Sequence, residues 1–147
     1  MPTVTVSMPY TEGCAGTVRR AVDAVLAQTH RDLVLVVVND GATEHPPWPA
    51  LAGITDPRLV RLDLPVNRGR YYADAVVLAA CGTPWWTVHD ADDAATPQWL
   101  EVMLAAATRK RADAVLTSQV VHGIRGRASV VPVRPWTGPV PDRITHH

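Results

Sequence analysis

Three carboxylates, Asp90, Asp92 and Asp93, lie within four positions shortly after the mostly apolar run Trp85–Val88, from which His89 separates them. Carboxylates this close together repel one another and raise each other's pKa unless they share a cation. Mg²⁺ and Mn²⁺ prefer oxygen ligands and are commonly held by one or two carboxylates, while substrate phosphates complete the coordination. The segment therefore suggests a site for a divalent metal and a diphosphate. An Asp-x-Asp pair alone is weak evidence, so its weight depends on the elements around it.

Strand-like patterns recur along the chain. The first, Val4–Met8, alternates apolar and polar residues and is expected to end at Pro9. The run Leu33–Val38 is continuously apolar and rich in valine, which is typical of a strand buried on both faces of a parallel sheet. Further strands are expected at residues 59–64, 85–88 and 114–117.

Helical patterns separate these strands. Apolar residues at helical spacing predict an amphipathic helix from Val18 to about Gln28, and residues 71–81 are apolar enough for a buried helix. Thr96 is expected to be the N-cap of a third helix, with Pro97 at its first position. The proline-rich stretch 42–57 is expected to hold little more than a short helix.

The alternation of strands and helices predicts an α/β fold with a mostly parallel central sheet and right-handed crossovers. Ligands of such sheets bind beyond the carboxyl ends of the strands. Three polar clusters follow predicted strands at that edge, namely Pro9–Glu12, Asn39–Gly41 and Asp90–Asp93. Their convergence strengthens the interpretation of the acidic segment as a binding site.

Composition limits the class of protein. A chain of 147 residues, 47% hydrophobic and 19% charged, is long enough for one core, so the strand and helix pattern is expected to form a single Rossmann-like domain. Fourteen basic residues balance fourteen acidic ones, so no net charge attracts nucleic acid or an anionic membrane. Cys14 and Cys81 lack the spacing of a zinc site, and two thiols are too few for a secreted disulfide scaffold. Without a leader-like or membrane-spanning apolar run, a cytoplasmic protein is expected.

The motifs and their order resemble family 2 glycosyltransferases of the GT-A fold, over roughly residues 2–121. The segments that carry the resemblance are Val4–Glu12, Leu26–Thr29, Val36–Thr43, Asn67–Gly69 and Asp90–Asp93, with Pro97 and Leu100-Glu101. The resemblance implies that residues 1–121 bind a nucleoside-diphosphate sugar, UDP- or dTDP-linked, with Mg²⁺ or Mn²⁺ on the Asp-Ala-Asp motif. It also implies transfer with inversion. Residues 122–147 are expected to form a proline- and arginine-rich tail or hairpin.

The resemblance assigns roles position by position at the nucleoside end. Asp40 would accept the N3–H of the nucleobase, although the residue before it is asparagine where relatives commonly carry aspartate. Pro9, Tyr10 and Thr11 would line the base and the ribose. Glu12 would close the loop that these three residues begin.

At the diphosphate end, the resemblance makes Asp92 the direct metal ligand and places Asp90 near the ribose or the metal. Relatives often carry an Ala-Arg-Asn triplet after the Asn-x-Gly segment, and this chain does not. Either Arg70 replaces the phosphate-facing arginine or no residue does. The general base of relatives lies in an acceptor-binding half further downstream, and none of Glu101, Asp113 and Asp142 matches it. The chain resembles a donor half that ends where the acceptor half would begin.

Two functions remain open. The chain is either a glycosyltransferase, completed by a partner chain or by homo-oligomerisation if not active alone, or a non-catalytic subunit that binds a nucleotide sugar in a regulatory or scaffold role. The missing base favours the second, and the combination of Asp40, Asp90 and Asp92 favours the first. A dinucleotide-binding oxidoreductase is excluded because the loop at residues 9–16 lacks GxGxxG. Trp85 and Trp86 are expected to fill the core on either side of a strand.

Overall fold

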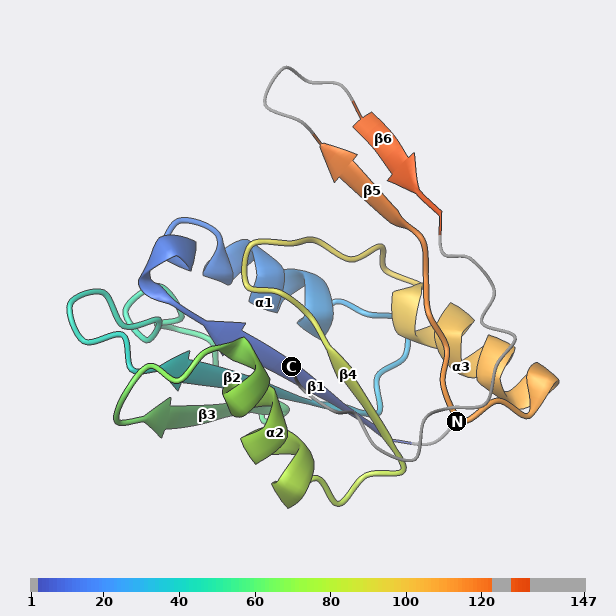
Figure 1. Cartoon of the computed structure of the whole chain (residues 1–147), viewed down its shortest axis with the longest axis horizontal. Coiled ribbons are helices and arrows are strands. Elements are labelled where there is room, and N and C mark those ends of the chain that lie inside the picture. Colours follow the sequence, from blue (N-terminus) through green and yellow to red (C-terminus); the bar gives the residue numbers. More distant parts are fainter. Residues whose placement is uncertain (1–2, 123–127, 133–147) are drawn as a thin grey trace. The chain divides into compact units, whose positions relative to one another are not determined.

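Four parallel strands form the main sheet, in the order β3-β2-β1-β4 (Figure 1). Their bounds are β1 Val4–Tyr10, β2 Leu33–Asp40, β3 Leu59–Leu64 and β4 Trp85–Val88. The computed structural model describes residues 3–122 and 128–132. All four strands belong to the first of two compact units, residues 1–105 and 106–147. The predicted α/β fold with a parallel central sheet is confirmed.

Strand β1 continues through Pro9, where the sequence predicted its end. The carbonyl of Ser7 accepts the N–H of His89 on the side of β4, and Pro9, two residues later, faces the same side. Pairing with β4 stops at Ser7 and Val88, so no ladder bond is lost where proline lacks its N–H. On the other side, the register with β2 runs on to Tyr10 opposite Asn39.

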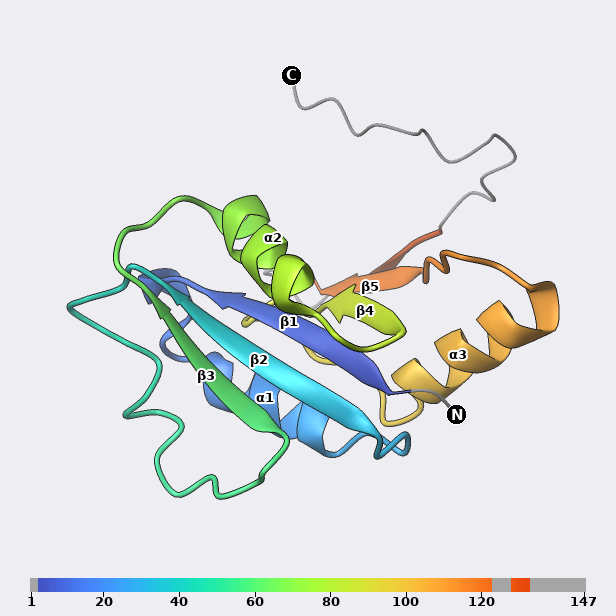
Figure 2. The same ribbon diagram turned by 90° about the horizontal axis from the view of Figure 1, so that it is seen from below.

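Helices α1 (Val18–Leu26) and α2 (Arg70–Ala80) cover opposite faces of the sheet (Figure 2). Buried apolar residues form two clusters, a larger one on the α1 side of the sheet and a smaller one on the α2 side. Helix α1 buries one apolar stripe in the larger core, as its spacing predicted. Helix α2 buries only Ala73, Asp74 and Val77. The prediction of a buried helix at 71–81 was therefore wrong about burial, because Tyr71 is 76% exposed and Leu78 is 52% exposed. Trp85 packs against the larger core and Trp86 against the α2 side, as predicted.

The buried side chain of Gln28 joins α1 to the start of α3 (Trp99–Lys110). Its amide nitrogen donates to the carbonyls of Ala24 and Thr96 at 3.2 and 2.8 Å, and its oxygen accepts the N–H of Leu100 at 3.1 Å. These bonds satisfy backbone groups that helix ends leave without partners. Helix α1 accordingly ends at Leu26, before the predicted Gln28, and α3 begins three residues after Thr96.

Two other predictions of local structure were wrong. Residues 42–57 contain turns and bends without a helix, because their prolines lack the N–H donors that a helix requires. No strand occurs at 114–117. Strand β5 instead spans Gln119–His122 and pairs antiparallel with β6 (Ala128–Val131) in a hairpin of the second unit. Residues 123–127 and 133–147, most of the predicted tail, lie outside the described part. No described helix is long and apolar enough to cross a membrane.

Candidate functional site

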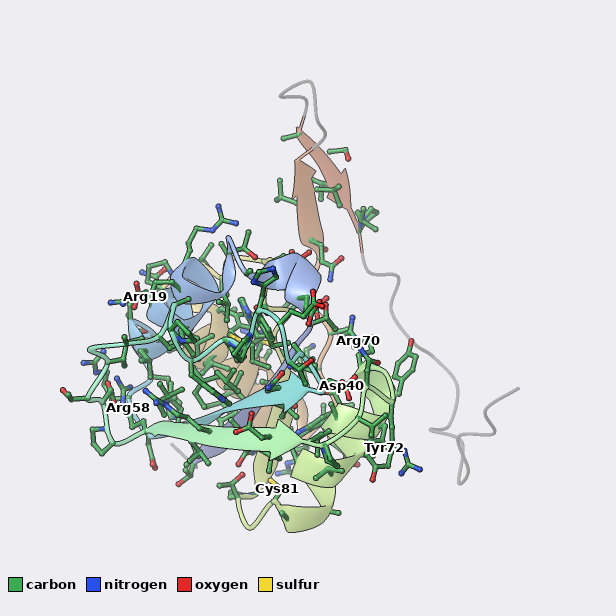
Figure 3. The ribbon with its side chains drawn as sticks, turned by 90° about the vertical axis from the view of Figure 1, so that its left-hand side faces the viewer. Arg19, Asp40, Arg58, Arg70, Tyr72 and Cys81 are labelled. Atoms are coloured by element: carbon green, nitrogen blue, oxygen red, sulfur yellow. The ribbon has the colours of Figure 1, made fainter. Side chains whose placement is uncertain are left out.

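The three predicted polar clusters lie at one edge of the sheet, because β1, β2 and β4 are parallel and end there. Val88 is level with Ser7, and the N–H of His89 donates to the Ser7 carbonyl at 2.9 Å. The acidic turn Asp90–Asp93 therefore begins beside the last residues of β1. Strand β2 brings Asp40 to the same edge (Figure 3).

The buried carboxylate of Asp40 holds the loop that starts α2. It accepts the backbone N–H groups of Arg68 and Gly69 at 3.0 and 2.8 Å, and only 1% of the residue is exposed. Glycine at position 41 allows the backbone after β2 to pass close to the loop before α2. With φ at +71°, an added Cβ would lie 2.2 Å from the nitrogen of Asn67. Asp40 thus fixes the position of Arg70, the first residue of α2, and its predicted contact with a nucleobase stays a prediction.

Asn39 explains the departure from the aspartate that relatives commonly carry. Its side chain exchanges two hydrogen bonds with the backbone of Ala42, at 3.0 and 3.1 Å. Its amide nitrogen also donates to the Asp63 carboxylate at 2.8 Å, and the Trp48 indole donates to the same carboxylate at 2.9 Å. An aspartate at position 39 would place two carboxylates together, whereas the amide supplies the donor that Asp63 requires.

The loop after β1 is tied to the loop after β2. The ring of Tyr10 is fully buried, its hydroxyl donates to the His45 carbonyl at 2.6 Å, and burial raises its pKa. Thr11 precedes the short 3-10 helix η1 (Glu12–Cys14) and is exposed, as is Glu12, whose carboxylate accepts the N–H of Glu44 at 3.2 Å. The roles predicted for these residues and Pro9 at the base and ribose stay predictions.

Arg70 and Asp90 form a bidentate ion pair at the centre of this edge. The two guanidinium nitrogens donate to the two carboxylate oxygens at 3.0 and 2.6 Å. The side chains are 47% and 38% exposed, so the pair faces solvent. Burial alone would lower the pKa of Arg70, but the hydrogen bond to Asp90 and the charges of Asp90 and Asp74 raise it. The pair joins the start of α2 to the acidic turn.

Asp74 is a further acidic residue near this pair, and it was not predicted from the sequence. It lies one helical turn after Arg70 and is buried, and its carboxylate accepts the Ser7 hydroxyl at 2.7 Å. Burial raises the pKa of Asp74, while the bond from Ser7 and the charge of Arg70 act in the opposite direction. The signal was present in the sequence as the i, i+4 spacing of Arg70 and Asp74, the single acid in an otherwise apolar helix.

Hydrogen bonds to its backbone hold the acidic turn in place. The N–H of Asp93 donates to the Asp90 carbonyl at 3.2 Å, and Arg20 of α1 donates to the Asp92 carbonyl at 3.2 Å. The buried ring of His89 contacts the Asp90 carbonyl through Nδ1 at 2.9 Å and packs edge-on against Trp99. Burial lowers the pKa of His89 despite the neighbouring carboxylates. His89 is thus a structural residue under the turn.

The turn offers carboxylate oxygens, the kind of ligand that a hard divalent cation prefers. Among the described residues, no group of three or more histidine, cysteine, aspartate or glutamate side chains gathers as a complete metal cage. The Asp92 and Asp93 side chains are exposed and, within residues 3–122 and 128–132, accept no hydrogen bond. The Asp90 carboxylate already contacts a cation, the Arg70 guanidinium. One or two carboxylates suffice for Mg²⁺ when phosphate oxygens and water complete the shell.

Comparison with known proteins assigns the family. Residues 5–142 match the family model described as glycosyl transferase family 2. The chain belongs to this family. It is 32% identical over 114 residues to the succinoglycan biosynthesis protein ExoO of Rhizobium meliloti (strain 1021), a match that covers 78% of this chain and 32% of ExoO.

Solved structures share the GT-A fold. A mannosyltransferase from Pyrobaculum calidifontis, in complex with GDP-Man and Mn²⁺, matches with a TM-score of 0.61 and 23% identity over 80% of this chain and 34% of its own. TarS of S. aureus matches with a TM-score of 0.67 and 19% identity over 85% of this chain and 37% of its own. TarS has also been solved with UDP and with UDP-GlcNAc. The chain spans about a third of the length of these proteins.

Proposed function

We propose that this chain is the donor-binding part of a glycosyltransferase and that its carboxyl edge binds the diphosphate of a nucleotide sugar together with Mg²⁺ or Mn²⁺. The observation that carries the proposal is the turn Asp90–Asp93, whose Asp92 and Asp93 are exposed, at the sheet edge where Asp40 holds the start of α2. Membership of the family supports it, as do the similar structures solved with GDP-Man and Mn²⁺ or with UDP-GlcNAc. The identity of the base and of the sugar is left open.

In this proposal Asp92 is the main metal ligand and Asp90 the second. Both offer hard oxygens, and Asp92 is held at the surface by the bond from Arg20 to its carbonyl. A bound divalent ion supplies charge neutralisation for the departing diphosphate. Arg70 adds a guanidinium whose planar donors suit phosphate oxygens. The loop fixed by Asp40 keeps Arg70 at this edge, where its guanidinium would contact the leaving diphosphate.

Inverting transfer requires a base that deprotonates the acceptor hydroxyl, and a positioned base contributes about 10²–10⁴-fold to rate. Asp74, the described acid next to the Arg70–Asp90 pair, is buried and accepts the Ser7 hydroxyl, so it does not suit this role. We therefore propose that the base comes from outside residues 3–122 and 128–132. The expected result is that the chain alone turns over donor slowly and transfers little sugar.

Separate substitution of the two neighbouring acids, Asp92 and Asp93, tests the site. Asp92→Asn is expected to weaken binding of UDP and GDP in the presence of Mn²⁺ by at least about 10-fold, because an anionic ligand is lost from a hard-cation site. Asp93→Asn is the matched control, since it makes the same change one position away and is expected to cost less than about 3-fold. Isothermal titration calorimetry measures both. If Asp93→Asn abolishes binding and Asp92→Asn does not, the assignment of ligands is wrong.

The alternative is a subunit that binds a nucleotide sugar without transferring it. The same carboxyl edge would serve that role, and the absence of a suitable base among the described residues favours it. Radiolabelled UDP-GlcNAc and GDP-mannose, incubated with Mn²⁺, separate the two functions. Release of free sugar or transfer to an added acceptor supports the enzyme, whereas tight binding with intact donor after long incubation supports the non-catalytic subunit. Light scattering during size exclusion tests for homo-oligomerisation.

A further inference from the structure

In the Arg70–Asp90 pair, the Arg70 guanidinium occupies the carboxylate that the proposed function assigns to a metal ion. Both oxygens of Asp90 accept guanidinium N–H groups, at 3.0 and 2.6 Å. A divalent cation and Arg70 would therefore compete for the same carboxylate. Such competition lowers the affinity of the site for free metal, because the ion pair must separate before the metal binds.

Arg70 has a second anionic neighbour on its own helix. Asp74 lies four residues later on α2, and its charge acts on the guanidinium together with that of Asp90. Its carboxylate is held by the Ser7 hydroxyl at 2.7 Å, so it stays in place whichever partner Arg70 takes. A guanidinium released from Asp90 thus remains beside a negative charge at the sheet edge, in reach of any anion that binds there.

We propose that Arg70 occupies Asp90 while the site holds no ligand, and that a diphosphate draws Arg70 away and leaves Asp90 free for the metal. This inference rests on the proposed function. Its consequence is positive coupling between the two ligands, because each removes the group that hinders the other. The site would then select the metal–diphosphate complex over free metal, and Arg70 would determine that selectivity.

Arg68 provides a control for the loss of positive charge. It lies two residues before Arg70, and its guanidinium stacks on Tyr72 at 4.7 Å from the ring centre. Its backbone N–H, which any amino acid but proline would supply, makes the bond to Asp40. Arg68→Gln and Arg70→Gln therefore each remove one positive charge near the start of α2, but only the second releases Asp90.

The first measurement is binding of Mn²⁺ alone, followed by the electron paramagnetic resonance signal of the free ion. Arg70→Gln is expected to bind Mn²⁺ about 5-fold more tightly than the wild type, the upper end for a partly exposed ion pair. Arg68→Gln is expected to stay within about 2-fold, since exposed charges are screened. Asp74→Asn is expected to bind Mn²⁺ about 2-fold more weakly, because Arg70 loses its other anionic neighbour and stays on Asp90.

The second measurement repeats the titration with saturating UDP or GDP. In the wild type the nucleotide is expected to tighten Mn²⁺ binding by at least about 10-fold, and in Arg70→Gln by clearly less. Equal Mn²⁺ affinities of Arg70→Gln and Arg68→Gln, with nucleotide binding still metal-dependent, would overturn this inference and leave the proposed function intact. Nucleotide binding that is the same in Mn²⁺ and in EDTA would overturn both.

Discussion

Gly41 allows the chain to pass close to the loop that starts α2, and its replacement by alanine should break that contact. At φ +71° an L-residue other than glycine is strained, which costs about 1–2 kcal/mol. The added Cβ would also lie 2.2 Å from the backbone nitrogen of Asn67 and 2.6 Å from the carbonyl carbon of Val66. Backbone atoms cannot rotate away as a side chain does, so overpacking adds about 1–3 kcal/mol. We expect Gly41→Ala to lose about 3 kcal/mol of unfolding free energy.

Gly53 is a matched control for the conformational part of this cost. Its φ is +79°, and nothing lies within 4 Å of an added Cβ. Gly53→Ala should therefore lose only about 1 kcal/mol, because restriction of the unfolded chain offsets part of the strain. Urea unfolding with linear extrapolation measures both variants. Losses within about 0.5 kcal/mol of each other would show that the loop does not press on Gly41, and the reasoning about Asp40 and the start of α2 would fail with it.

Three further variants test other parts of the fold. Arg58 lowers the pKa of Asp56 to about 2 through hydrogen bonds, so the pair stabilises the protein above pH about 4 and this is lost as the pH falls toward 2. This pKa shift limits the loss of unfolding free energy in Asp56→Asn at pH 7 to about 2 kcal/mol, and partial exposure of the pair reduces it to about 1 kcal/mol. When unfolding is measured from pH 4 to pH 2, the variant should lose less stability than the wild type. Asn39→Asp should lower the free energy of unfolding by about 2 kcal/mol at pH 7 and by less at pH 4, where protonation of the introduced carboxyl group relieves its repulsion from Asp63. An equal loss at both pH values in urea unfolding would contradict this. Trp86→Phe should change stability by less than about 1 kcal/mol, because it removes a buried ring N–H that has no acceptor among the described residues, and a loss above about 2 kcal/mol would refute that.

The sheet and its polar edge were predictable because they depend on local patterns. A valine-rich run indicates a buried parallel strand, and polar residues after each strand must then meet at one edge, as the ends of β1, β2 and β4 do. The opposite packing of Trp85 and Trp86 follows from strand alternation alone. These inferences require no knowledge of long-range contacts.

What the sequence did not indicate depends on pairing between distant residues. Pro9 stays in β1 only because β4 ends before it, and the sequence does not contain that register. The strand predicted at 114–117 was replaced by the hairpin β5–β6, whose pairing requires residues further along the chain. Asp74 has a local signal in its spacing from Arg70, but its hydrogen bond with Ser7, 67 positions earlier, is not visible in the sequence. The cytoplasmic location, the domain boundary at residue 121 and the site roles stay predictions.

The most direct test of the central claim is a calorimetric titration of UDP and GDP into the wild-type chain, once with Mn²⁺ and once with EDTA. The charge density of Asp90, Asp92 and Asp93 leads us to expect that at least one nucleotide binds with Mn²⁺ and that this binding is lost with EDTA. Equal affinity in the two conditions would contradict the account, since the diphosphate would then be held without the metal that the acidic turn is proposed to bind.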